Sequence, residues 1–142
     1  QQGGNMIVQF NTNNFISSLK GKIAPYDFAI GRTRITDEKS KVTFLDPSHV
    51  VLNSPNKITM KDFDGWIQER SVYHAEGLNA AQWQTPLGLT DPGEAEQNGS
   101  LAIAAFGKGN FVYTGLVFFR ELPAGVPGAY RLLANIIALP SR

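Results

Sequence analysis

Two short stretches of this 142-residue chain combine aromatic rings with an arginine and a glutamate, and they hold the side chains best suited to chemistry. One covers residues 66–70 (Trp-Ile-Gln-Glu-Arg), with Tyr73 just beyond it, and the other covers residues 118–121 (Phe-Phe-Arg-Glu). Arginine forms bidentate bonds with carboxylates and stacks on rings, so such groups serve in recognition or in contacts between domains. The residues predicted to contact a ligand or an interface are Trp66, Glu69, Arg70, Arg120 and Glu121.

Several interpretations of these stretches remain open at the level of sequence. Trp66 could offer a flat apolar face to a sugar ring while the charged groups bind its hydroxyls, which requires Trp66 to be exposed at a groove. Glu69 and Glu121 could act as the acid and base of a hydrolase, which requires them to converge in a concave pocket. Alternatively, a salt bridge between the two stretches could simply fasten a loop to a sheet. A docking or oligomerisation module would instead need a broad apolar surface patch.

The rest of the chain offers little catalytic chemistry. There is no cysteine, and the two histidines, His49 and His74, have no second ligand at metal-binding spacing. No Gly-x-Ser-x-Gly elbow marks a serine nucleophile. The acidic loop at residues 91–96 could hold calcium, but it does not match the EF-hand pattern, and a solvated turn is the favoured interpretation. The sequence therefore predicts no catalytic residue, no metal and no cofactor.

Composition restricts the class of protein. Hydrophobic residues make up 42% and charged residues 18%, which suits one α/β domain over residues 1–142 with a real core. A net charge of +1 gives no case for binding nucleic acid, and no apolar run approaches the length of a membrane span. The absence of cysteine is compatible with the periplasm or the cell exterior but does not require either.

Residues 6–10 follow a Gly-Gly turn and form an almost continuous apolar run. Such a run predicts a strand buried on both faces of a parallel sheet. Because strands of this kind normally follow earlier elements, we expect the chain to be a C-terminal fragment of a larger multidomain protein. An edge strand at an ordinary N-terminus is the alternative.

Turn and cap signals place the other elements. Strands are expected at residues 101–106 and 111–116, joined by a hairpin loop at residues 107–110, and a helix at residues 129–139, started by Pro127. A charged loop is expected at Arg120 and Glu121, between the hairpin and that helix. The remaining predictions are short helices at residues 15–21 and 59–65, a helical turn at residues 46–49, and strands at residues 67–73 and 86–90. A further strand is expected within residues 35–45, where Val42 and Phe44 alternate with Lys41 and Thr43.

Residues 66–73, 91–94 (Asp-Pro-Gly-Glu) and 107–139 together resemble the C-terminal region of long PIG-L (LmbE-like) deacetylase family proteins. In that family the last module resembles a glutamine-amidotransferase-like domain related to the ThuA-like group. The residues at 3–10 suit a mid-domain strand of the same fold. The resemblance implies a partial flavodoxin-like (class I glutamine-amidotransferase-like) sandwich with a mixed sheet, a C-terminal β-hairpin and a closing helix.

The catalytic motifs of these families are missing from the chain. It has no His-Pro-Asp-Asp zinc motif, no nucleophilic cysteine, and no Gly-His after the penultimate strand, where residues 115–118 read Gly-Leu-Val-Phe. A fold by itself does not fix a function. The resemblance therefore implies a non-catalytic accessory module that docks against the deacetylase domain of the same parent protein or helps to bind carbohydrate. A carboxylate-dependent hydrolase acting on a glycan-type substrate and a structural oligomerisation domain are the alternatives.

Overall fold

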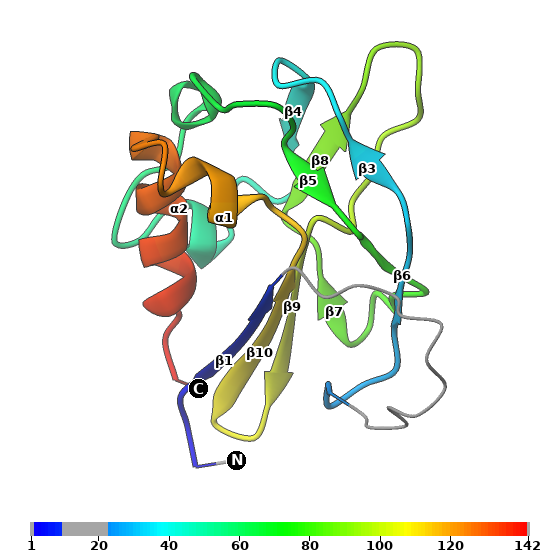
Figure 1. Ribbon diagram of the computed structural model, residues 1–142. Coiled ribbons are helices and arrows are strands. Elements are labelled where there is room, and N and C mark those ends of the chain that lie inside the picture. Colours follow the sequence, from blue (N-terminus) through cyan, green and yellow to red (C-terminus); the bar gives the residue numbers. More distant parts are fainter. Residues whose placement is uncertain (1, 10–22, 142) are drawn as a thin grey trace.

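The computed structural model describes residues 2–9 and 23–141, which form a mixed α/β structure around a four-stranded sheet (Figure 1). The strand order is β1 (Asn5–Gln9), β10 (Gly109–Thr114), β9 (Leu101–Phe106) and β7 (Trp83–Gln84). β1 runs parallel to β10, whereas the other pairs are antiparallel, so the predicted mixed sheet and C-terminal hairpin are confirmed. The hairpin turn is tighter than the predicted loop, because Phe106 already pairs with Gly109.

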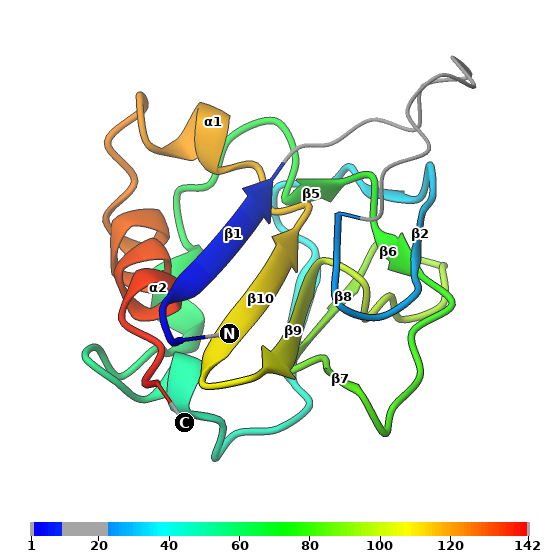
Figure 2. The same ribbon diagram turned by 90° about the horizontal axis from the view of Figure 1, so that it is seen from below.

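β1 lies at the edge of the sheet, beside α2 (Pro127–Ile137), as Figure 2 shows from below. The prediction of a strand in parallel pairing is confirmed, but the prediction that both of its faces are buried is wrong. Ile7 packs against the core, whereas the side chain of Met6 on the opposite face is 56% exposed. The face of Met6 is only partly covered, since Val8 on the same face is half-buried against the cluster that contains Trp83 and Tyr113.

Three two-stranded ladders form the other half of the molecule. The ladders pair β2 (Ala29–Ile30) with β6 (Ala75–Glu76), β3 (Arg34–Ile35) with β5 (Ser71–Val72), and β4 (Lys41–Phe44) with β8 (Leu87–Thr90). β8 confirms the strand predicted at residues 86–90.

The strand predicted within residues 35–45 is confirmed as β4. It is separated from β3 by a turn, in which Asp91 accepts hydrogen bonds from the backbone N–H groups of Thr36 (2.7 Å) and Asp37 (3.2 Å). The strand expected at residues 67–73 is reduced to β5, because a tight turn occupies residues 67–69. Both interruptions depend on backbone turns that the apolar pattern did not reveal.

The short helices begin at recognisable caps. The helix predicted at residues 59–65 is η2 (Met60–Phe63), which begins at the predicted cap Thr59 and ends earlier than expected; Thr59 and Asp62 form a capping box. The helical turn predicted at residues 46–49 is displaced to η1 (Val50–Leu52), where the His49 ring caps the backbone N–H of Val51. The charged loop expected at Arg120 and Glu121 is instead a short helix, α1 (Phe118–Glu121). The helix predicted at residues 15–21 lies outside the described residues.

The closing helix is confirmed as α2, with Pro127 in its first turn. Its apolar side shares one buried cluster with the sheet residues Ile103 and Val112. The two polar residues of α2 both bond to neighbouring chain: Arg131 Nε donates to Asp62 Oδ1 (2.7 Å) while its side chain stays partly exposed, and Asn135 is fully buried. None of the helices in the described part of the chain has the length and apolarity needed to cross a bilayer.

The opposite face of the sheet carries an aromatic cluster. Phe28 lies over this face and packs against Trp83, Phe111 and Tyr113 at ring-centroid distances of 5.2–6.4 Å. The chain around Phe28 therefore covers the β7 side of this face, and the β1 side is left to the hollow described below.

Candidate functional site

The two stretches predicted from sequence meet at Glu69. Arg34 Nη2 donates to Glu69 Oε2 at 2.6 Å, and Arg120 Nε donates to Glu69 Oε1 at 3.0 Å. Glu69 itself is only 4% exposed, so both of its oxygens are occupied by arginines at the edge of the interior. The salt bridge considered from sequence therefore exists, and it links the loop before β5 to α1.

Glu121 anchors the same loop from α1. It is fully buried, and both of its oxygens accept the backbone N–H of Ile67, at 3.1 and 3.2 Å. Burial raises the pKa of Glu121, and the hydrogen bond from Ile67 and the charges of Arg70 and Arg120 oppose that rise. The carboxyl group functions here as a fixed acceptor with no access to solvent.

A γ-turn at residues 67–69 shapes the loop before β5, so that the Ile67 N–H meets Glu121 and the Glu69 carboxylate meets Arg120. Glu69 N donates to Ile67 O at 2.8 Å, while Gln68 between them has a positive φ of 63°. This turn is rare and strained for a residue other than glycine. The backbone N–H of Gln68 donates to Glu38 Oε2 (3.1 Å), so contacts on both sides hold the turn in place.

Trp66 is an internal packing residue. Its ring stacks on Phe63 at 5.5 Å, lies 6.3 Å from Phe118 of α1, and donates from Nε1 to Asp62 O at 2.9 Å. Only 3% of Trp66 is exposed, so the condition that its ring be open at a groove is not met.

We call Trp66, Glu69, Arg70, Arg120 and Glu121 the fastening network. The structure brings all five predicted residues together. Glu69 and Glu121 are buried and occupied, and they do not converge in an open pocket. Arg70 differs from the others, because among the described residues its guanidinium donates only to Phe63 O (2.9 Å), and it lies over the Phe63 ring. Contact of the network with a ligand or partner stays a prediction.

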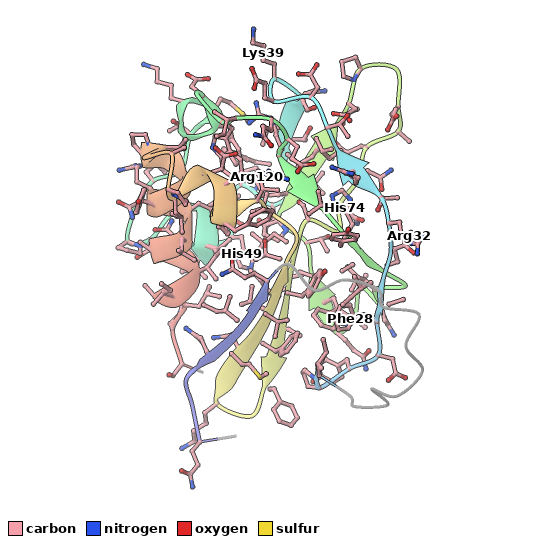
Figure 3. The ribbon with its side chains drawn as sticks, in the orientation of Figure 1. Phe28, Arg32, Lys39, His49, His74 and Arg120 are labelled. Atoms are coloured by element: carbon pink, nitrogen blue, oxygen red, sulfur yellow. The ribbon has the colours of Figure 1, made fainter. Side chains whose placement is uncertain are left out.

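The two histidines bond within the chain. His74 is 1% exposed, shares a 2.6 Å hydrogen bond between its Nε2 and Ser71 Oγ, and has no partner at Nδ1 among the described residues. Burial lowers the pKa of His74 to about 4. Because His49 Nδ1 accepts from Val51 N, its proton is assigned to Nε2, which donates to Gln84 Oε1 at 3.0 Å. Figure 3 shows that the two histidines lie apart.

The described residues contain no group of three or more His, Cys, Asp or Glu side chains placed to hold a metal ion. In the acidic loop considered for calcium, the Asp91 carboxylate is used internally, accepting from the backbone and hydroxyl of Thr36 and from the Ser40 hydroxyl. These bonds fix the turn between β3 and β4.

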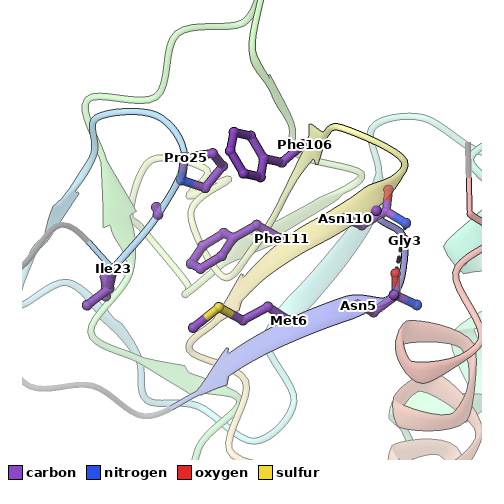
Figure 4. Close-up of a pocket in the computed structure, with 11 residues that line it drawn as sticks. Gly3, Asn5, Met6, Ile23, Pro25, Phe106, Asn110 and Phe111 are labelled. Atoms are coloured by element: carbon purple, nitrogen blue, oxygen red, sulfur yellow. Dashed lines mark hydrogen bonds between the residues drawn. The ribbon is translucent and has the colours of Figure 1, made fainter. Parts of the chain in front are cut away.

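A second region, which the sequence did not single out, is an apolar hollow of about 510 Å³ on the outer face of β1 and the hairpin. Figure 4 shows the side chains of Met6, Phe111 and Phe106 on one side of it, with Ile23 and Pro25 opposite. Three of these side chains are substantially exposed: Met6 (56%), Phe106 (42%) and Ile23 (40%).

Hydrogen bonds join the segments at the polar end of the hollow. Asn110 Nδ2 donates to Asn5 Oδ1 (2.9 Å) and to Pro140 O (3.0 Å), which ties the hairpin to β1 and to the chain after α2. The hollow was missed because its walls come from three separate segments. The only local signal was an apolar residue at the outer position of two strands, Met6 in β1 and Phe106 in β9.

No protein-family model, curated protein or solved structure matches this chain. Its function must therefore be inferred from the residues themselves and from the resemblance of their sequence.

Proposed function

We propose that this chain is a non-catalytic accessory module that docks, through the hollow around Met6 and Phe106, onto the catalytic domain of a PIG-L/LmbE-like deacetylase of which it is part. The observation that carries the proposal is the hollow itself, whose exposed apolar side chains surround a concave site of about 510 Å³. The hollow is concave and lined mainly by apolar side chains, and large apolar side chains that fill pockets dominate protein interfaces.

The edge position of β1 supports a partner on this side of the molecule. β1 pairs only with β10 among the described strands, and in parallel. Parallel strands are normally covered on both faces, and an open strand edge presents unpaired N–H and C=O groups to any neighbouring chain. A partner seated in the hollow would cover Met6 and shield this edge.

The finer description of the fold belongs to the same proposal. A partial flavodoxin-like, glutamine-amidotransferase-like sandwich would contain a parallel strand beside a closing hairpin and helix, which is the arrangement of β1, β9–β10 and α2. The missing cysteine and zinc motifs favour a module that has kept the scaffold without the catalytic site.

The hydrolase alternative has less support. A general acid or base must come within hydrogen-bond reach of the substrate. Glu69 is buried between two arginines, and Glu121 is fully buried against the Ile67 backbone. Neither carboxylate has a free position from which to exchange a proton with a bound molecule.

The proposal is tested by measuring binding between this chain and the deacetylase-type domain encoded in the same reading frame, by isothermal titration calorimetry. We expect 1:1 binding, weakened at least tenfold (~1.4 kcal/mol) by Phe106→Ser. Met60→Ser is the matched control, because Met60 is 50% exposed on η2 and does not line the hollow. It should bind like the wild type.

Two results would contradict the proposal. One is the absence of any deacetylase-type domain from the reading frame, and the other is equal binding by Phe106→Ser and the wild type. If the chain alone instead sediments as an oligomer that Phe106→Ser dissociates, the hollow is an oligomerisation surface, and the docking proposal is wrong.

A further inference from the structure

A separate cavity of about 350 Å³ lies beside the fastening network and shares no residue with the hollow. Four charged residues, Glu38, Lys39, Asp64 and Arg70, line it, together with Phe63 and Trp66. Its volume falls in the range of pockets that bind small molecules. Lys39 extends outward at the top of the molecule in Figure 3, at one side of this cavity.

Arg70 is the unusual member of the lining. It is only 6% exposed, yet in the described part of the chain its guanidinium has a single hydrogen bond, from Nη1 to Phe63 O, and no ion pair. Its Nε is buried without a partner. Arg34 and Arg120, by contrast, both pair with Glu69.

A buried guanidinium with unused donors is costly, because arginine carries five N–H groups that water would otherwise satisfy. Burial lowers the pKa of Arg70. The opposing effect of the neighbouring carboxylates is smaller; these are Asp37, Asp64, Glu121 and Glu38. A hydrogen-bond acceptor bound in the cavity would pair with some of the guanidinium N–H groups of Arg70 that the described residues leave without a partner.

The charges around the cavity restrict what that acceptor can be. Two cations, Lys39 and Arg70, face two carboxylates, Glu38 and Asp64, and the lining is therefore neutral overall. A lining without net charge gives no overall Coulomb attraction to a net anion or to a net cation. A hydroxyl group suits both kinds of wall, because it accepts from the cations and donates to the carboxylates.

We propose that this cavity binds a small neutral ligand with several hydroxyl groups, the chemistry of a sugar or polyol. Its hydroxyl oxygens accept from Arg70 and Lys39, and its hydroxyl protons go to Glu38 and Asp64. Phe63 and Trp66 form the apolar part of the wall. The site goes beyond the docking function and does not depend on it.

The test is an NMR titration of the whole ¹⁵N-labelled chain with methyl β-glucoside, followed through backbone amide shifts. We expect saturable shifts at Glu38, Lys39 and Gly65, with a Kd of about 1 mM, and none at residues 106–111. Lys39→Ala should weaken binding several-fold without unfolding the chain, because Lys39 is exposed. Lys108→Ala, an exposed lysine on the hairpin turn, is the matched control and should have no effect.

Inorganic phosphate is titrated in parallel at constant ionic strength. Saturable shifts at the same amides with phosphate, and none with the glucoside, would make the cavity an anion site and overturn the proposal. Shifts confined to other residues, or no shift up to about 50 mM glucoside, fifty times the expected Kd, would overturn it as well.

Discussion

The fastening network and the hollow differ in almost every respect. The network consists of charged and aromatic residues of the kind that serves recognition, yet Glu69 and Glu121 are buried and use their oxygens within the chain. The hollow has apolar walls, and its most exposed side chains, Met6 and Phe106, carry no chemistry. The comparison teaches that residue type alone does not locate a functional surface: burial and hydrogen-bond partners decide which groups remain available.

The largest expected effect on stability comes from Trp66, the packed aromatic residue of the fastening network. Trp66→Ala should lower the free energy of unfolding by about 3–5 kcal/mol, because it leaves a cavity against Phe63 and Phe118. Urea denaturation followed by circular dichroism measures the loss. A loss below about 1 kcal/mol would mean that the indole is not packed as described, and that Trp66 is open to a ligand after all.

Acidification should destabilise the folded chain through the buried His74. The folded-state pKa of His74 is about 4, against 6.5 for the free side chain, so the unfolded chain binds more protons between these values. Stability should therefore fall as pH decreases from 6.5 to 4, by about 3 kcal/mol in total. Thermal unfolding across this range tests the prediction.

The control compares how steeply the unfolding free energy varies with pH in the wild type and in His74→Gln, rather than their absolute stabilities. His74→Gln removes the titrating group, and its unfolding free energy should vary less with pH over the same range. An equal slope in both proteins would assign the acid sensitivity to other groups.

A moderate effect is expected for the ion pairs of the network. Glu69→Gln should cost about 1–3 kcal/mol, because hydrogen bonds to charged partners are lost at a buried position. Arg34→Gln should cost no more than about 1 kcal/mol, because 53% of the Arg34 side chain is exposed. A double-mutant cycle between Glu69 and Arg120 should give a coupling of about 0.5 kcal/mol or more, and zero coupling would contradict the pairing.

The smallest effect on stability is expected in the hollow. Phe106→Ser should change the free energy of unfolding by less than about 1 kcal/mol, because Phe106 is 42% exposed. Urea denaturation beside Trp66→Ala gives the direct contrast between the two regions. A loss as large as that of Trp66→Ala would show that Phe106 serves the core and not an interface.

Local signals made part of this fold predictable. The Thr59 capping box, the hairpin of β9 and β10, and the Pro127 start of α2 are encoded within a few neighbouring residues. Features that distant residues decide could not be predicted. The break between β3 and β4 requires Asp91, more than 50 residues away, as the separation of the hydrogen-bonded pairs shows.

The candidate sites, too, were predictable only where their residues are close together in the sequence. The fastening network was recognised because each half of it is a compact stretch of sequence, but its internal role became visible only through burial. The hollow combines side chains from β1, β9 and residues 23–25, and the face of β1 that contributes Met6 could not be told from a buried one by its apolar residues.

The central claim is that this chain meets its partner through the hollow and not through the fastening network. Hydrogen–deuterium exchange of the chain, alone and with the deacetylase-type domain, tests it most directly. The account predicts added protection at residues 4–6 and 106–111, with no change at residues 66–70 and 118–121. Protection confined to residues 66–70 and 118–121 would contradict it.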